Sequence, residues 1–80
     1  MQVPKIIGVV PQADYGLDIT FDGGIVKRLD IKPYIAEFKP FERLKNVALF
    51  NSVKVDVGGM GIVWNEQIDL SRYDAWEFGV

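Results

Sequence analysis

A chain of 80 residues has room for one hydrophobic core, so we expect a single domain over residues 1–80. Hydrophobic residues make up 49% of the chain, a fraction too high for a disordered protein. The net charge is −2 and the cations are scattered, which argues against a dedicated nucleic-acid-binding domain, because such domains gather basic residues in a patch.

Cysteine and histidine are both absent from the chain. The sequence therefore lacks thiolate zinc ligands, Ser-His-Asp or Cys-His nucleophile pairs, and the usual general base near neutral pH. We predict a non-enzymatic protein with no catalytic residues, no cofactor and no metal. Because no disulfide, signal peptide or membrane span is indicated, we expect a soluble, cytoplasmic protein.

Three strands are predicted in the first part of the chain. Residues 5–10 are apolar on both faces, which indicates a strand that is covered on each side or bends at Gly8. A break at residues 11–14 separates it from a second strand over 15–21, which alternates between apolar and polar residues. The third strand is expected over 25–31.

The turn Asp22-Gly23-Gly24 allows a prediction of strand register. A three-residue loop with Gly24 in the left-handed region pairs Leu17 with Leu29. It also places Asp18 opposite Arg28 as a favourable cross-strand ion pair. We therefore predict the three-residue loop rather than a two-residue one.

The middle of the chain predicts short helical turns. Pro33 opens one turn through residue 36, and Pro40 suits the first position of a short helix through Lys45. Asn46 is a favourable N-cap for a further turn over residues 47–50. We expect five apolar side chains of this region to cover the sheet as a lid: Phe38, Phe41, Leu44, Leu49 and Phe50.

A second hairpin is predicted around the glycine-rich segment 58–61. A four-residue loop pairs Val57 with Ile62 and Val55 with Trp64 on the core face. The same segment has the composition of a phosphate-binding loop, but such a loop needs a following helix N-terminus. Residues 62–64 read as a strand and no lysine follows the glycines, so we interpret the segment as a hairpin turn.

The C-terminal residues predict a short helix. Residues 68–71 lead out of the sheet, Ser71 is a suitable N-cap, and a helix from residue 72 to about 78 is expected to end at Gly79. Taken together, the elements predict an α+β fold, with a small antiparallel sheet of about five strands in two hairpins packed against short helices.

Carboxylates are the remaining candidates for acid–base chemistry or a hard metal site. Four of them gather near the first hairpin without the spacing of a calcium loop: Asp14, Asp18, Asp22 and Asp30. Asp30 and Asp69 lie between apolar residues at predicted strand ends, where a carboxylate commonly accepts backbone amides and fixes a turn. The alternative is a small-ligand or divalent-metal-binding domain or a carboxylate-based enzyme that uses Asp18, Asp30 or Asp56.

The aromatic residues divide into two groups. Four are expected in the core: Phe21, Phe41, Phe50 and Trp64. Four others lie in irregular or terminal segments, where an exposed aromatic marks an interface, and we predict them as the candidate partner interface: Tyr34, Tyr73, Trp76 and Phe78. For Trp76 and Phe78, docking onto the sheet is an equal alternative.

Eight segments follow one another in a characteristic order: IIGV (6–9), LDITFDGG (17–24), LDI with Pro33 (29–33), FERL (41–44), LF (49–50), VKVD (53–56), GIVW (61–64) and IDLS (68–71). Together they resemble a small bacterial family, domain of unknown function 2442, over nearly the whole chain. The resemblance implies an α+β fold of antiparallel strands on short helices.

The same resemblance bears on function. Members are often encoded beside another small protein, domain of unknown function 4160, an arrangement that suggests a toxin–antitoxin pair. Some relatives carry a helix-turn-helix domain after this one, and because the printed sequence ends at Val80 we expect no transfer of their DNA binding. The family has no agreed catalytic residues to carry over.

We therefore predict a protein-interaction module that is the antitoxin-like or accessory half of a two-gene pair. Its partner is expected to be a small protein or a second copy of the chain, because association covers apolar surface that a small domain cannot bury. A second alternative is weak nucleic-acid binding, if four cations fold onto one face: Lys27, Arg28, Arg43 and Lys45.

Overall fold

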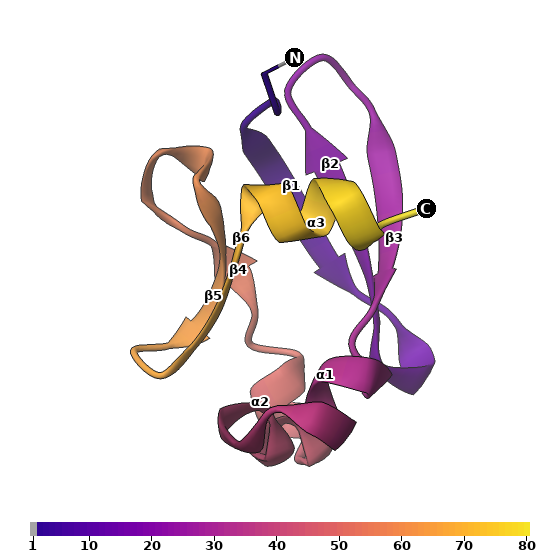
Figure 1. The fold of residues 1–80 in the computed structure, drawn as a ribbon, viewed down its shortest axis with the longest axis vertical. Helices are drawn as coiled ribbons and strands as arrows, with labels where there is room; N and C mark the ends of the chain where they lie inside the picture. The colour runs from indigo at the N-terminus through magenta and orange to yellow at the C-terminus, as the bar shows by residue number, and fades with distance from the viewer. Residues whose placement is uncertain (1) are drawn as a thin grey trace.

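Two three-stranded antiparallel sheets and three short α-helices share one core in the computed structural model, which describes residues 2–80 (Figure 1). The first sheet has the order β1-β2-β3, with β1 Ile6–Pro11, β2 Gly16–Phe21 and β3 Val26–Asp30. The second has the order β4-β5-β6, with β4 Lys54–Val55, β5 Gly61–Asn65 and β6 Ile68–Ser71. The predicted α+β class is confirmed, with six strands in two sheets instead of about five.

The register of the first sheet agrees with the prediction from its turn. Leu17 lies opposite Leu29 and Asp18 opposite Arg28, and Gly24 has a φ of +90°. At the start of β1 the register shifts between Ile6 and Gly8, and Ile7 is exposed. The strand therefore bends near Gly8 and is not covered on both faces, because one face of this sheet remains open to solvent.

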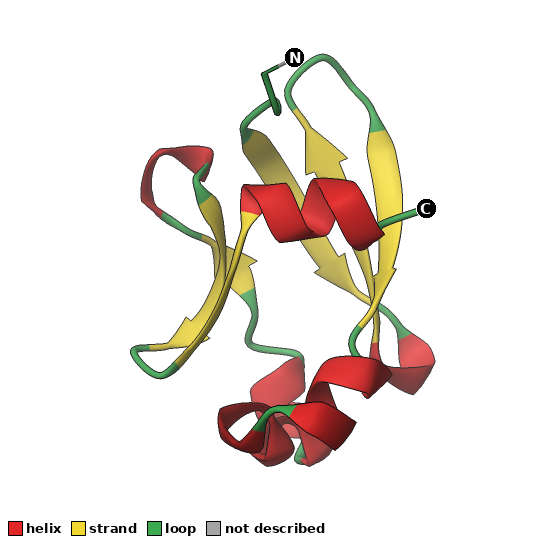
Figure 2. Cartoon of the chain, viewed as in Figure 1, coloured by secondary structure: helices red, strands yellow, loops and turns green. Residues whose placement is uncertain are grey.

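Short helical segments connect the two sheets and gather at one end of them (Figure 2). They are α1 Lys32–Glu37, the 3₁₀ segment η2 Lys39–Lys45 and α2 Val47–Phe50. The predicted cap is confirmed, because the Asn46 side chain accepts hydrogen bonds from the amides of Ala48 and Leu49 over 3.0 and 3.3 Å.

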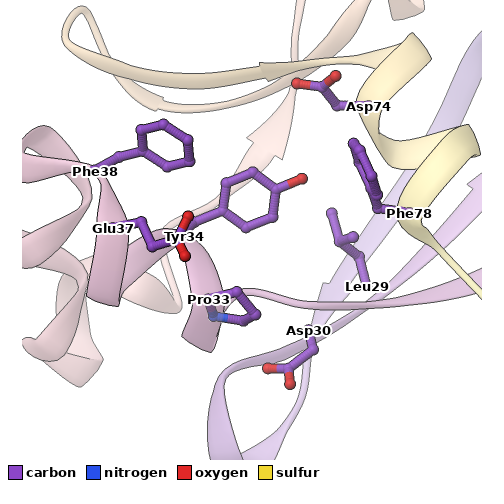
Figure 3. Close-up of a pocket in the computed structure, with 8 residues that line it drawn as sticks. All are labelled: Leu29, Asp30, Pro33, Tyr34, Glu37, Phe38, Asp74 and Phe78. Atoms are coloured by element: carbon purple, nitrogen blue, oxygen red, sulfur yellow. The ribbon is translucent and has the colours of Figure 1, made fainter.

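The predicted hydrophobic lid is correct except at Phe38. Phe41, Leu44 and Phe50 are buried and Leu49 is partly buried against the core. Phe38 is 51% exposed, because it follows the last residue of α1 in an extended conformation and its side chain points into an open space beside Tyr34 (Figure 3). The inclusion of Phe38 in the lid was wrong.

The register predicted for the second hairpin is also wrong. Val55 lies opposite Ile62, and Lys54 opposite Val63, whereas the sequence pattern predicted Val57 with Ile62 and Val55 with Trp64. The strand ends early because the Asp56 carboxylate accepts the amide of Val57 over 2.8 Å and starts the short 3₁₀ segment η3 Val57–Gly59. As a result Val57 is 88% exposed rather than part of the core.

The glycine-rich segment is a turn, as predicted, and it packs against the first sheet. Gly59 has a φ of +71°, and a Cβ atom there would lie 2.6 Å from the carbonyl oxygen of Ile6. Gly61 lies even closer to the backbone of Leu70 in β6, where a Cβ atom would collide with the carbonyl oxygen. The glycines therefore allow close contact between backbones, and they hold β1 and β6 against this loop.

The C-terminal helix α3, Arg72–Phe78, crosses between the two sheets (Figure 1). Its predicted ends are confirmed, since the Ser71 hydroxyl accepts the amide of Asp74 over 3.2 Å and Gly79 follows the last helical residue. Residues 68–71, predicted as a lead into this helix, form the strand β6. Beyond the helix, Val80 and Arg28 exchange two backbone hydrogen bonds of 3.0 and 2.9 Å, so the chain end lies along β3.

All four aromatic residues predicted for the core are buried: Phe21, Phe41, Phe50 and Trp64. Trp64 comes from the second sheet and donates its indole N–H to the carbonyl of Phe50 over 3.0 Å. This bond satisfies the one polar atom of a large buried side chain and links the second sheet to α2.

Candidate functional site

A groove of about 580 Å³ lies between α1 and α3 over the end of β3 (Figure 3). Its volume falls within the range of about 300–1,000 Å³ that is common for ligand-binding clefts. Eight residues line it: Leu29, Asp30, Pro33, Tyr34, Glu37, Phe38, Asp74 and Phe78. The walls come from two helices that are far apart in the sequence, and the floor comes from the sheet.

The first wall consists of α1. Pro33 lies in the first turn, where its fixed φ favours a helix, and the Asp30 carboxylate accepts the amide of Lys32 over 3.0 Å. Tyr34 lies in α1 and Phe38 is the extended residue directly after it, and their ring centroids are 5.9 Å apart. The ring centroid of Tyr34 also lies 5.5 Å from that of the buried Phe41, and this contact holds Tyr34 in place.

The second wall consists of α3. Asp74 and Phe78 are four residues apart, so both side chains lie along the same face of this short helix. Figure 3 shows Phe78 across the groove from Tyr34, with Asp74 beside it. Phe78 is 61% exposed, whereas Leu29 in the floor is buried. The groove is thus an open apolar surface on a buried base.

Three carboxylates line the groove beside the aromatic rings, and none of the lining residues within the described part of the chain is basic. Asp30 has an ion-pair partner, because Lys32 Nζ lies 3.6 Å from its Oδ1 atom. Among the described residues 2–80, neither Glu37 nor Asp74 has a basic group within ion-pair distance. The groove therefore combines exposed aromatic rings with uncompensated negative charge.

Tyr34 is half-buried, and its hydroxyl points from α1 toward α3 (Figure 3). Burial is the main cause that raises the pKa of the Tyr34 phenol above its usual value of 10.0, and the nearby Asp74 carboxylate raises it further. The phenol is consequently protonated at neutral pH and can donate a hydrogen bond inside the groove.

The structure separates the four residues that were predicted as an interface. Tyr34 and Phe78 face the same groove. Trp76 is half-buried, packs edge-to-face on Phe21 at 4.9 Å, and has Lys27 Nζ 4.1 Å above its ring. Tyr73 is 56% exposed but does not line the groove, and its hydroxyl accepts a hydrogen bond from Arg72 over 3.1 Å.

Sequence reasoning missed several residues of this groove. Phe38 was assigned to the hydrophobic lid, Pro33 only to the start of a helical turn, and neither Glu37 nor Asp74 to a binding site. The available signal was the spacing of four residues between Asp74 and Phe78, which places this pair on one face of α3. That signal does not show that this face lies opposite Tyr34 and Phe38.

The aspartates singled out from the sequence have separate structural roles, except that Asp14 and Asp30 share Lys32, whose Nζ atom lies 3.0 and 3.6 Å from their carboxylates. Asp18 accepts Arg28 Nε over 3.0 Å, Asp30 accepts the amide of Lys32, and Asp56 caps η3. Asp69 is exposed in the middle of β6 opposite Val63, so the proposed turn-fixing role fits Asp30 and not Asp69. Within residues 2–80 no three carboxylates come together as a possible metal site.

The cations considered for nucleic-acid binding do not share one face. Lys27 and Arg28 are neighbours in β3 and project from opposite sides of the sheet. Lys27 Nζ donates to the carbonyl of Trp76 over 2.7 Å on the helix-covered side, and Arg28 pairs with Asp18 on the open side. The condition set for that alternative, one basic face, is therefore not met.

Comparison with protein families matches residues 6–72 to the family described as "Protein of unknown function (DUF2442)". This segment ends at the first residue of α3, so Asp74 and Phe78 lie outside the match. Neither the curated proteins nor the solved structures contain a match. No helix in the described part of the chain has the length and apolar character needed to cross a membrane.

Proposed function

Because the chain belongs to the DUF2442 family, whose function is unknown, we propose its role from the groove: it is a non-enzymatic protein-interaction module. The observation that carries this proposal is the exposure of Phe38 and Phe78, at 51% and 61%, on the two walls of one open groove. Exposed aromatic rings around a concave surface are typical of contact sites, because binding removes their apolar area from water.

The groove also explains why the partner is expected to be a protein segment. An open surface between two helices admits an extended chain, whereas a small molecule is usually enclosed on most sides. The walls are short helices fixed by a proline, by caps and by contacts with the core, so the surface is formed before a partner arrives.

The finer part of the proposal concerns the biological setting. We propose that the protein is the antitoxin-like or accessory half of a two-gene pair, with the product of the adjacent gene as its partner. The support for this setting is the resemblance to a family whose members are often encoded beside a second small protein. A homodimer formed through the same groove is the competing outcome.

Co-expression with the product of the adjacent gene, followed by size-exclusion chromatography with light scattering, tests this proposal. We expect one complex for the native chain and at least a tenfold loss of affinity for Phe78→Ala, since truncating a central aromatic anchor commonly costs about 2 kcal/mol. Val47→Ala is the matched control, because Val47 is similarly exposed, at 57%, on α2 outside the groove.

Two results would contradict the proposal. The first is separate elution of the two proteins at micromolar concentration, together with a monomeric mass for this chain alone. The second is a complex that Phe78→Ala and Val47→Ala weaken equally, because binding would then not involve the groove.

A further inference from the structure

We infer that the groove between α1 and α3 receives a lysine or arginine side chain from an extended segment of the partner protein. This inference rests on the proposed function and specifies its chemistry. The cation would lie among the rings of Tyr34, Phe38 and Phe78, with its charge facing Glu37 and Asp74.

The aromatic rings are suited to a cation. The face of an aromatic ring carries partial negative charge and attracts an ammonium or guanidinium group within about 6 Å of the ring centre. Tyr34 and Phe38 present neighbouring rings inclined by 34°, and Phe78 lies across from Tyr34 (Figure 3). The chain already uses this interaction internally, where Lys27 Nζ lies 4.1 Å from the ring of Trp76.

The charges around the rings select a basic occupant over an acidic one. Glu37 and Asp74 lack ion-pair partners among the described residues, and none of the eight lining residues is basic. An acidic segment would be repelled by these carboxylates. A purely apolar segment would remove the two carboxylates from water without providing a positive charge to pair with them, which is unfavourable.

The apolar lining suits the rest of the same side chain. Lysine and arginine have long aliphatic stems that pack on apolar surface while the charged end reaches polar groups. Pro33 and Leu29 provide such a surface beside the rings. The volume of about 580 Å³ also leaves room for neighbouring residues of the segment, and the Tyr34 hydroxyl can donate to one of their backbone carbonyls.

An NMR titration of the full chain tests the chemistry without knowledge of the partner. The probes are N-acetyl-arginine amide, N-acetyl-lysine amide and, as an uncharged analogue of similar shape, N-acetyl-norleucine amide. We expect both cationic probes to shift the amide signals of Tyr34, Phe38 and Phe78 and to bind at least fivefold more tightly than the norleucine probe. Equal or tighter binding of the norleucine probe, or shifts spread outside the groove, would overturn the inference.

Charge-removing variants provide the second arm. Glu37→Gln combined with Asp74→Asn should weaken the binding of the cationic probes about tenfold. Salt at 0.5 M should weaken their binding to the native chain, since both changes reduce the electrostatic attraction between probe and groove. Glu66→Gln and Glu77→Gln are the matched controls, because both glutamates are exposed and lie outside the groove. Glu37→Gln alone keeps the test valid if Asp74→Asn lowers the stability of α3.

The same variants separate this inference from the proposed function. The partner complex could be weakened by Phe78→Ala but unchanged in the variant that combines Glu37→Gln with Asp74→Asn. This result would overturn the inference of a bound lysine or arginine side chain, and it would leave the proposed interaction module standing. A complex that is unchanged by Phe78→Ala would overturn the interaction through the groove itself.

Discussion

Gly59 lies directly against the carbonyl oxygen of Ile6, so the glycine-rich loop and the first strand are in contact through their backbones. We predict that Gly59→Ala lowers the free energy of unfolding by about 3 kcal/mol, because the substitution combines a left-handed φ with overpacking. Gly58→Ala is the control, since Gly58 has nearly the same φ, +70°, but only the Met60 side chain nearby. We expect Gly58→Ala to lower the free energy of unfolding, measured by urea denaturation, by about 1 kcal/mol. Equal losses in the two variants would show that the contact with Ile6 is unimportant.

The hydrogen bond from Trp64 to the Phe50 carbonyl leads to a second prediction. Trp64→Phe should lower the free energy of unfolding by about 2–3 kcal/mol, because it leaves a buried carbonyl without its donor and creates a small cavity. Trp76→Phe, at a half-buried position, should cost less than about 1 kcal/mol. Chemical denaturation followed by circular dichroism measures both, and a similar loss in the two variants would count against the Trp64 bond.

The two aromatic residues of α3 should respond differently to truncation. Trp76→Ala should cost about 2 kcal/mol of stability, since Trp76 packs edge-to-face on the buried Phe21. Phe78→Ala should cost at most about 0.5 kcal/mol, since its ring is mostly exposed. Thermal melts of the two variants check this difference. A large loss for Phe78→Ala would indicate that its ring stabilises the fold and would weaken its assignment to an interface.

The raised pKa of Tyr34 predicts a dependence of stability on alkaline pH. Its pKa in the folded protein lies above the unfolded value of about 10, so folding favours the protonated phenol. This contribution is complete below pH 10 and is lost as the pH rises through the folded pKa. Urea unfolding between pH 9 and 11 should show the decrease in the native chain and a smaller one in Tyr34→Phe.

A titration of the phenol itself checks the two causes of that shift. Asp74→Asn should lower the pKa of Tyr34 only part of the way toward 10.0, because burial is the larger cause and is unaffected. Ring-carbon NMR of Tyr34 gives this value directly. A pKa that returns fully to 10.0 in Asp74→Asn would mean that the carboxylate, not burial, dominates.

Asp30 and Asp69 have similar sequence neighbours but different structural roles. Asp30→Ala should lower the free energy of unfolding by about 1 kcal/mol, because the amide of Lys32 loses its acceptor at the start of α1. Asp69→Ala should change it by no more than about 0.5 kcal/mol, because Asp69 is exposed within β6. If Asp69→Ala is the more damaging of the two in denaturant titrations, the assigned roles are wrong.

The sequence by itself determined the features that depend on neighbours along the chain. The turn at Gly24 fixed the pairing of β2 with β3, because loop length and glycine conformation set the register of a hairpin. Asn46 and Ser71 marked helix starts for the same local reason, since each side chain accepts amides only two or three residues ahead.

The tertiary structure alone decided the groove, and it acted together with the local Asp56 cap on the second register. The loop after β4 is fitted to Ile6 at the other end of the chain, so alternation near Val57 carried no information about where the strand ends. The groove exists because α3 crosses the sheets and brings Asp74 and Phe78 opposite Tyr34 and Phe38. The shared face of Asp74 and Phe78 is readable from their spacing of four residues, but its position opposite Tyr34 and Phe38 depends on packing between segments remote in sequence, which no local pattern specifies.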